Sequence, residues 1–330
     1  MSHIIQKKIF CLLVALLTVL CICTGCKEND LKEVAIIKYV TDAPLDDAEQ
    51  GIIDGLKAGG YVDGDNIHIS IYNCNADSST VVSSVRTAVS KSDLIFAIAT
   101  PVAQVLVQEL EKQEIDTPVL FTAVTDPVQS GIISNAQKPG GNVSGTSDIN
   151  PVADQIKLVK ELDPNATKVG FIYTAGEHNS EIQLTMAREA AQSINVEVVA
   201  QAINNDTEIK SVTESLIASG ISAMYIPTDN KVVASANVVV NACNLAHIPT
   251  ICGEGSVLDK GATITVGSVN YSELGKMTGE MGVRVLNGTK AGDMPVGYYS
   301  NSALEINVTA ANNAGIVIPE ELKNKATKTR

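Results

Sequence analysis

Short apolar runs alternate with longer amphipathic segments along most of this chain, and few folds are compatible with that alternation. From Val34 onward each apolar run has the length and β-branched content of a buried strand, and the segments between runs have the spacing of amphipathic helices. Parallel strands joined by helices produce this pattern, because a crossover between parallel strands usually contains a helix. The sequence therefore predicts an α/β fold with parallel sheets.

Two series of such units follow one another, so we expect two doubly wound lobes of similar size. In the first series, strands are expected near 34–40, 67–72, 94–99 and 118–122, and helices near 45–59, 78–91 and 101–113. In the second, strands are expected near 168–173, 196–202, 222–226 and 248–252, and helices near 151–162, 179–194, 206–219 and 230–245. A chain of 330 residues, 45% of them hydrophobic, is long enough to bury two such cores.

The connections between the lobes are expected to form a hinge of several strands. The glycine- and proline-rich segment 139–146 indicates a turn before an extended crossing. A strand followed by another crossing at 264–270, a helix at 271–286, a strand near 303–307 and a C-terminal helix can carry the chain back to the first lobe and out again. We therefore predict one lobe from 34–145 with about 270–295, and the other from 146–269 with about 296–330.

The N-terminus resembles the signal peptide of a bacterial lipoprotein. Two lysines precede an apolar run at 9–22 that is too short to span a bilayer unaided, and Cys23-Thr24-Gly25-Cys26 follows. The small residues before Cys26 match a lipobox, although Cys23 stands where that motif usually has leucine. The resemblance implies a signal peptide at 1–25, a lipidated (palmitate-bearing) Cys26 and a polar tether at 26–33, which would hold the body at the outer face of the cell membrane.

The composition favours a protein that binds small molecules. A net charge of −13 argues against a nucleic-acid partner, because phosphates need a basic patch. We expect no metal and no cofactor, since His68, His178 and His247 have no metal-ligand spacing with each other or with cysteines. No nucleophile elbow is present, and we expect a binding protein and not an enzyme. The cysteines of the body are expected to be ordinary buried thiols, with a bridge between Cys243 and Cys252 left open.

The loops at the two ends of the predicted strands differ in kind. At the N-terminal ends they are plain turns, such as 59–66, 163–165 and 219–220. At the C-terminal ends they collect hydroxyl, carboxylate and amide groups, in the segments 39–44, 99–101, 122–127, 173–180, 227–230 and 253–256. Open α/β sheets bind ligands at that edge. If the two edges face each other, they line a polar cleft.

Several of these loops predict helix starts that suit a zwitterion. Thr100 and Asp126 each precede a proline and are expected to be N-caps, so that free N–H groups and a hydroxyl there can hold a carboxylate. In the other lobe, the strand 223–226 ends at Pro227, and Asp229 or Asn230 can cap the next helix. The carboxylate of Asp229 would suit an ammonium group.

Taken as a set, these motifs resemble the substrate-binding lipoproteins of ABC importers, specifically the tryptophan/tyrosine-type family with a periplasmic-binding-protein type I fold. The matching segments are Ala97-Ile98-Ala99-Thr100-Pro101, Phe121-Thr122-Ala123-Val124-Thr125-Asp126-Pro127-Val128, Pro139-Gly140-Gly141-Asn142-Val143-Ser144-Gly145-Thr146-Ser147-Asp148, Tyr225-Ile226-Pro227-Thr228-Asp229-Asn230, Glu254-Gly255-Ser256-Val257 and Tyr271-Ser272-Glu273-Leu274-Gly275. The resemblance implies a monomer that captures an aromatic or related amino acid and delivers it to a membrane permease with a separate ATPase.

The resemblance also implies roles for individual residues. Thr100 and Thr125 become candidates for the ligand carboxylate and Asp229 for its amino group. Asn230, Glu254 and Ser147 would flank them, and Tyr39, Leu45 and Tyr173 would line the side-chain pocket. Because the chain has no tryptophan, an aromatic ligand would stack on tyrosine or phenylalanine, or pack against aliphatic side chains.

Two other functions fit the same fold. A sensor would report the ligand to a membrane receptor instead of feeding a permease, and nothing within the chain separates the two. A nucleoside or sugar ligand would need several aromatic side chains for stacking, and few are placed for it. In each case we expect a two-state hinge, because a ligand that touches both lobes only when they are closed shifts the population toward closure.

Overall fold

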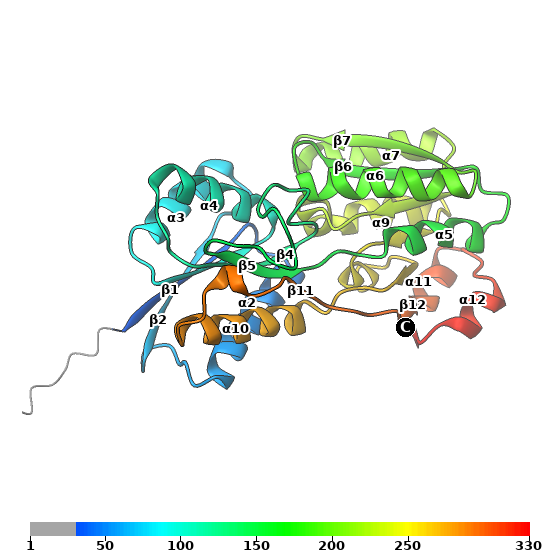
Figure 1. The fold of residues 1–330 in the computed structure, drawn as a ribbon. Coiled ribbons are helices and arrows are strands. Elements are labelled where there is room, and N and C mark those ends of the chain that lie inside the picture. Colours follow the sequence, from blue (N-terminus) through cyan, green and yellow to red (C-terminus); the bar gives the residue numbers. More distant parts are fainter. Residues whose placement is uncertain (1–30) are drawn as a thin grey trace, which may run out of the picture.

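Two lobes, each built around one mainly parallel sheet, make up the body of the molecule (Figure 1). The computed structural model describes residues 31–330. The predicted signal peptide and Cys26 lie outside the described residues, as does most of the predicted tether. The predicted α/β fold with two parallel-sheet lobes is confirmed.

The sheet of the first lobe has six strands in the order β11-β5-β4-β3-β1-β2, all parallel. Its strands are β1 (Lys32–Lys38), β2 (Ile67–Asn73), β3 (Leu94–Ile98), β4 (Val119–Val124), β5 (Val143–Ser147) and β11 (Gly297–Tyr298). Every residue of β3 and β4 is buried, as expected for central strands covered on both faces. Helices α2 (Ala43–Ala58) and α10 (Tyr271–Leu286) cover one face, and α3 (Ser78–Val89) and α4 (Thr100–Gln113) the other (Figure 1).

The sheet of the second lobe has seven strands in the order β13-β12-β10-β9-β8-β6-β7, parallel except for the antiparallel pair β10 and β12. Its strands are β6 (Lys168–Thr174), β7 (Glu197–Ile203), β8 (Ala223–Ile226), β9 (Thr250–Cys252), β10 (Ile264–Val266), β12 (Leu304–Ile306) and β13 (Lys328–Thr329). Its helices are α5 (Val152–Leu162), α6 (His178–Ser193), α7 (Ile209–Ala218), α8 (Asn230–Ala234), α9 (Ala236–Leu245), α11 (Val308–Asn313) and α12 (Glu320–Lys325).

Three predicted elements differ in detail from the structure. The helix expected at 230–245 is interrupted at Ser235, which ends α8 and precedes α9. The second half of the segment 139–146, expected to be a turn before an extended crossing, belongs to strand β5. A Cβ on Gly145 of this strand would lie 2.0 Å from the carbonyl oxygen of Phe121. Glycine is therefore required for β5 to approach β4 this closely. The single C-terminal helix is two short helices, followed by the edge strand β13.

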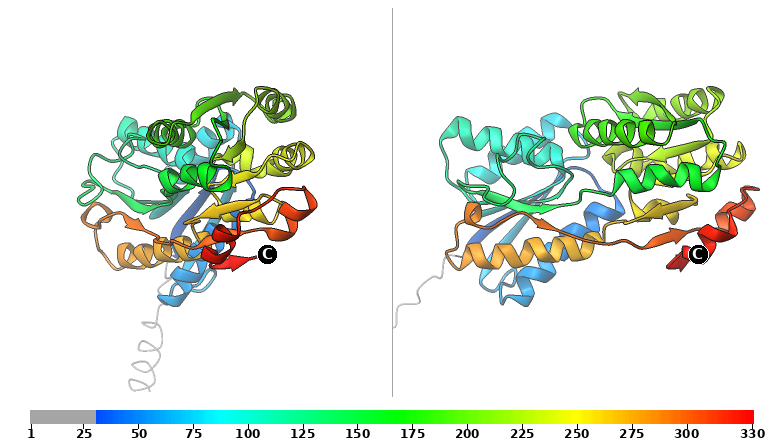
Figure 2. Two further views of the ribbon diagram at one scale, coloured as in Figure 1. Left: turned by 90° about the vertical axis from the view of Figure 1, so that its right-hand side faces the viewer. Right: turned by 45° about the vertical axis from the view of Figure 1, so that its right-hand side comes forward.

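The chain crosses between the two sheets three times: from β5 to α5, from β10 to α10, and from β11 to β12 (Figure 2). The residue limits of the two lobes remain a proposal, and we now place them according to which sheet each strand joins. Ser147 at the end of β5 and the pair Gly297–Tyr298 then belong to the first lobe. The cysteines Cys74, Cys243 and Cys252 are buried free thiols.

Glycine contacts fix two helices of the first lobe against each other. A Cβ on Gly275 of α10 would lie 2.1 Å from the carbonyl oxygen of Ala48, and a Cβ on Gly51 of α2 would lie 2.2 Å from that of Ser272. The two backbones therefore touch directly. Because both helices begin at the edge that faces the second lobe, this contact sets the relative positions of their N-terminal residues (Figure 1).

Candidate functional site

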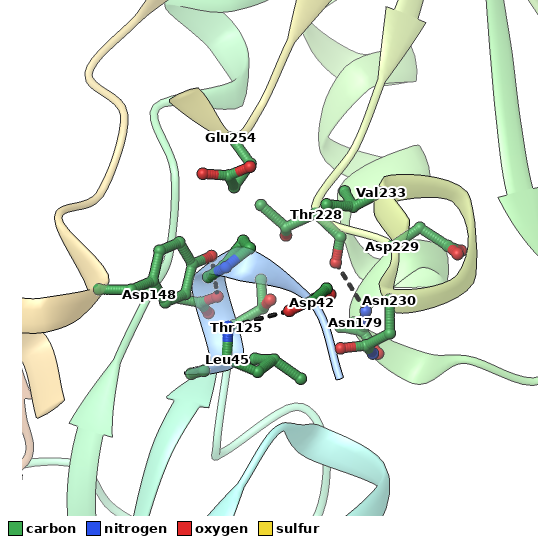
Figure 3. Close-up of a pocket in the computed structure, with 13 residues that line it drawn as sticks. Asp42, Leu45, Thr125, Asp148, Asn179, Thr228, Asp229, Asn230, Val233 and Glu254 are labelled. Atoms are coloured by element: carbon green, nitrogen blue, oxygen red, sulfur yellow. Dashed lines mark hydrogen bonds between the residues drawn. The ribbon is translucent and has the colours of Figure 1, made fainter. Parts of the chain in front are cut away.

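A cavity with about 330 Å³ of empty space lies between the two lobes. Residues from both lobes line it, and all of them belong to loops, strand ends and helix starts at the carboxyl ends of strands (Figure 3). The lining residues are Asp42, Pro44, Leu45, Ala123, Thr125, Asp148, Asn179, Thr228, Asp229, Asn230, Val233, Glu254 and Tyr271.

The structure brings five of the ten predicted ligand-binding residues to this cavity: Leu45, Thr125, Asp229, Asn230 and Glu254. The other five, Tyr39, Thr100, Asp126, Ser147 and Tyr173, are not among its lining residues. The side chains of these five residues make local contacts, or none that the structure records. The hydroxyl of Ser147 donates to the carbonyl oxygen of Thr125 at 2.8 Å and thereby supports a lining residue. Tyr173 packs edge-on against Phe171, with ring centroids 6.1 Å apart.

Neither of the two N-caps predicted for the first lobe caps a helix. Ala99, with φ +82°, occupies the cap position of α4, and Thr100 is the first helical residue. The Thr100 hydroxyl is buried and has no hydrogen-bond partner within residues 31–330. Asp126 accepts hydrogen bonds from the backbone of Val128 and Gln129 in a turn, and no helix follows it.

Asp229 caps α8 as predicted, and both of its carboxylate oxygens are already used within the second lobe. One oxygen accepts from the backbone N–H of Thr174 at 2.6 Å and from Ser180 Oγ at 2.7 Å. The other accepts from Thr174 Oγ1 at 2.7 Å and from the backbone N–H of Val232 at 2.9 Å. The side chain is fully buried. Four donors on one carboxylate are characteristic of a structural anion, because each bond stabilises the charged form.

Glu177 supports the same corner of the cavity from behind. Its Oε2 atom accepts from the backbone N–H of Asn230 at 3.1 Å and from the side-chain amide of Asn230 at 2.8 Å. Burial, with the nearby charge of Asp229, raises the pKa of the Glu177 carboxyl. Sequence analysis did not single out Glu177 for this role, because its partners lie 53 residues away in the chain.

Among the carboxylates that line the cavity, Asp148 is the one with a buried oxygen that accepts no hydrogen bond from residues 31–330. It follows β5 on a crossing between the lobes and is 4% exposed. Its Oδ2 atom accepts from the hydroxyl of Tyr271 at 2.8 Å, whereas Oδ1 is buried and has no partner among the described residues. Burial raises the pKa of Asp148, and the hydrogen bond from Tyr271 opposes that rise. A buried carboxylate oxygen without a donor is strongly disfavoured unless a ligand supplies one.

Two further residues with carboxyl groups line the cavity, and each accepts hydrogen bonds from a residue two or three positions further along the chain. Asp42 caps α2 by accepting from the N–H of Leu45 at 2.9 Å, and burial raises the pKa of Asp42 to about 6. Glu254 accepts from the backbone and hydroxyl of Ser256, and burial raises its pKa to about 7. No lysine or arginine of the described chain lines the cavity. The site is therefore acidic and suits a ligand with a positive charge.

These raised pKa values predict how stability depends on pH. A carboxyl whose pKa is higher in the folded than in the unfolded state binds its proton more tightly in the folded state, so stability falls as pH rises through that interval. The ligand-free protein is expected to lose roughly 2 kcal/mol of unfolding free energy between about pH 5 and about pH 7.5. Denaturant unfolding at the two pH values measures this, and Glu254→Gln should reduce the difference. A wild-type protein that becomes more stable over this interval would contradict the assignment.

Sequence comparisons identify relatives along the whole body. The model of the family described as ABC transporter substrate binding protein matches residues 33–330. A tyrosine-binding protein of Clostridioides difficile (strain R20291) is 38% identical over 318 residues, which cover 92% of this chain and 90% of that protein.

Two solved structures match the fold at similar identity. One, from Streptococcus pneumonia, is a complex with L-Trp; it is 32% identical, with a TM-score of 0.84 and coverage of 91% of this chain and 100% of that chain. The other is the ligand-free, open structure of a substrate binding protein with adhesive properties from Clostridium difficile. It is 34% identical, with a TM-score of 0.67, and the match covers 90% of this chain and 99% of that chain.

Proposed function

Because this chain belongs to the ABC transporter substrate-binding protein family, we propose that it captures an aromatic amino acid between its lobes and delivers it to a membrane permease. The family binds small molecules outside the cytoplasm for ABC transporters. The part of the chain assigned to it runs from residue 33 to residue 330.

The observation that carries the proposal is the open Oδ1 atom of Asp148 in an acidic cavity between the lobes. An α-ammonium group supplies the missing donors and neutralises part of the surrounding charge. Thr125, a residue of the predicted carboxylate site, also lines the cavity, which supports a carboxylate contact there. The L-Trp in one solved relative and the name of the tyrosine-binding relative support an aromatic side chain.

The arrangement of the lobes supports a closed state. Two relatives of nearly equal identity differ in their similarity to this structure: the L-Trp complex has a TM-score of 0.84 and the ligand-free, open structure 0.67. Pro44 and Leu45 of the first lobe and Val233 of the second line one cavity, so the apolar surface of a ligand is buried only when the lobes meet. A ligand therefore shifts the population toward this closed form, which the permease can recognise.

We also propose that the protein is a monomeric, lipid-anchored binding protein without catalytic activity. The support for an anchor is the sequence Thr24-Gly25-Cys26 after an apolar run. No helix within residues 31–330 is both long and apolar enough to cross a membrane. Lipidation of Cys26, including a palmitate chain, would hold the body at the outer face of the cell membrane.

A ligand panel tests the proposed function. We expect isothermal titration of the full chain, purified in detergent, to give micromolar or tighter binding of L-tyrosine or L-tryptophan, which corresponds to about −8 kcal/mol. Heat stability should rise with the same ligands. The panel includes nucleosides and simple sugars as controls. Binding of one of these, with no response to any amino acid, would retain the fold and refute the amino-acid ligand.

A further inference from the structure

Asn179, which lines the cavity on the lobe opposite Asp42 and Leu45, carries a second unpaired oxygen. It lies in the first turn of α6, is 3% exposed and lines the cavity (Figure 3). Its amide nitrogen donates to the carbonyl oxygen of Thr228 at 3.0 Å and lies 3.4 Å from Glu177 Oε2. Its Oδ1 atom is buried and has no hydrogen-bond partner in the described part of the chain.

The contacts of Asn179 determine which end of its amide is open. The carbonyl oxygen of Thr228 can only accept, so the atom that faces it must be the nitrogen. The remaining atom is then the oxygen, an acceptor that lacks a donor. An amide oxygen buried in this way is disfavoured by an amount similar to a lost hydrogen bond. The open position therefore calls for a donor, not for an acceptor or an apolar group.

Of the other polar groups at this corner, Glu177 Oε1 is also buried without a partner among the described residues, but Glu177 does not line the cavity. Asn230 donates to Glu177 at 2.8 Å, and Asp229 accepts four hydrogen bonds within its own lobe. The open carboxylate oxygen of Asp148 lies across the cavity from Asn179 (Figure 3). An ammonium group is held more strongly by the charged oxygen of Asp148 than by a neutral amide. The oxygen of Asn179 then remains for the far end of the ligand.

We infer that Asn179 recognises a hydrogen-bond donor on the ligand side chain, so that the cavity selects a phenol hydroxyl or an indole N–H over an unsubstituted ring. This inference rests on the proposed capture of an aromatic amino acid. Binding sites built to hydrogen-bond a substrate group reject analogues that lack the group, because the protein atom is then left unpaired. We expect L-tyrosine to bind about 100-fold more tightly than L-phenylalanine.

A ligand series on the unmodified full chain separates donor recognition from ring size. The probes are L-tyrosine, 4-amino-L-phenylalanine, L-phenylalanine and 4-methoxy-L-phenylalanine. The first two carry a donor at the para position, and the methoxy compound carries only an acceptor. We expect titration calorimetry to show tight binding of the two donors and weak binding of the others. Equal affinity for L-tyrosine and L-phenylalanine would overturn the inference while leaving the proposed function intact, and silence toward all four probes and toward L-tryptophan would refute both.

Variants assign the discrimination to one side chain. In Asn179→Leu the affinity ratio of L-tyrosine to L-phenylalanine should fall to within about 3-fold, since the unpaired oxygen is gone. Gln183→Leu is the matched control. Gln183 lies one turn further along α6 and also holds Thr228, whose backbone N–H donates to Gln183 Oε1 at 3.2 Å, but Gln183 does not line the cavity. Loss of Gln183 should leave the ratio unchanged. A ratio that survives Asn179→Leu, or falls equally in Gln183→Leu, would contradict the assignment.

Discussion

Asp148→Asn is expected to weaken the binding of L-tyrosine by about 100-fold or more, with little effect on folding. The substitution keeps the shape of the side chain but removes the negative charge, and truncating one partner of a buried charge pair typically costs about 2–5 kcal/mol. The hydroxyl of Tyr271, which now donates to Asp148 at 2.8 Å, can still donate to the amide oxygen of asparagine. The loss should therefore appear in affinity and not in stability.

Calorimetric titration with two ligands distinguishes a direct contact from a disturbed cavity. If Asp148 holds the ammonium group, 3-(4-hydroxyphenyl)propionic acid, which lacks the amine, should bind wild type and Asp148→Asn equally weakly. Asp126→Asn provides the matched comparison, because Asp126 lies outside the cavity lining. The affinity of this variant for L-tyrosine should stay within about 3-fold of wild type. If Asp148→Asn binds L-tyrosine with wild-type affinity, then another residue holds the ammonium group.

Asp229→Ala is expected to destabilise the second lobe by about 3 kcal/mol or more. The substitution leaves four donors without their acceptor: two from Thr174, one from Ser180 and one from Val232. Each buried donor left unpaired costs about 1–3 kcal/mol, and the start of α8 also loses its cap. The same carboxylate is therefore more important for the fold than for direct contact with ligand.

Equilibrium unfolding in urea, followed by circular dichroism, measures this loss. Asp206→Ala serves as a control, because Asp206 is exposed and its side chain makes no hydrogen bond within residues 31–330 that the structure records. Its unfolding free energy should change by less than about 0.5 kcal/mol. If Asp229→Ala keeps wild-type stability but no longer binds L-tyrosine, then Asp229 is a ligand contact, as the family resemblance implies.

Periodicity in the sequence was sufficient to predict most of the fold. The helix expected at 271–286 has those limits, and the strands expected near 67–72 and 94–99 end within one residue of β2 and β3. These elements have clear apolar runs and strong caps, which are local properties. The segment 143–147 was not recognised as a strand, because Val143-Ser144-Gly145-Thr146-Ser147 has one apolar branched residue and pairs with β4 only through tertiary contacts.

The sequence alone determined that polar groups gather at the carboxyl ends of the strands, since both the strand pattern and the polar loops are visible in it. The family resemblance also pointed to Leu45, Thr125, Asp229, Asn230 and Glu254, which line the cavity. The tertiary structure decided which carboxylate is open. Asp148 is held by Tyr271 from 123 residues away, and Asp229 is saturated by Thr174 from 55 residues away. Hydrogen-bond partners across such separations depend on how the sheets and crossings pack, and local sequence patterns carry no record of that pairing.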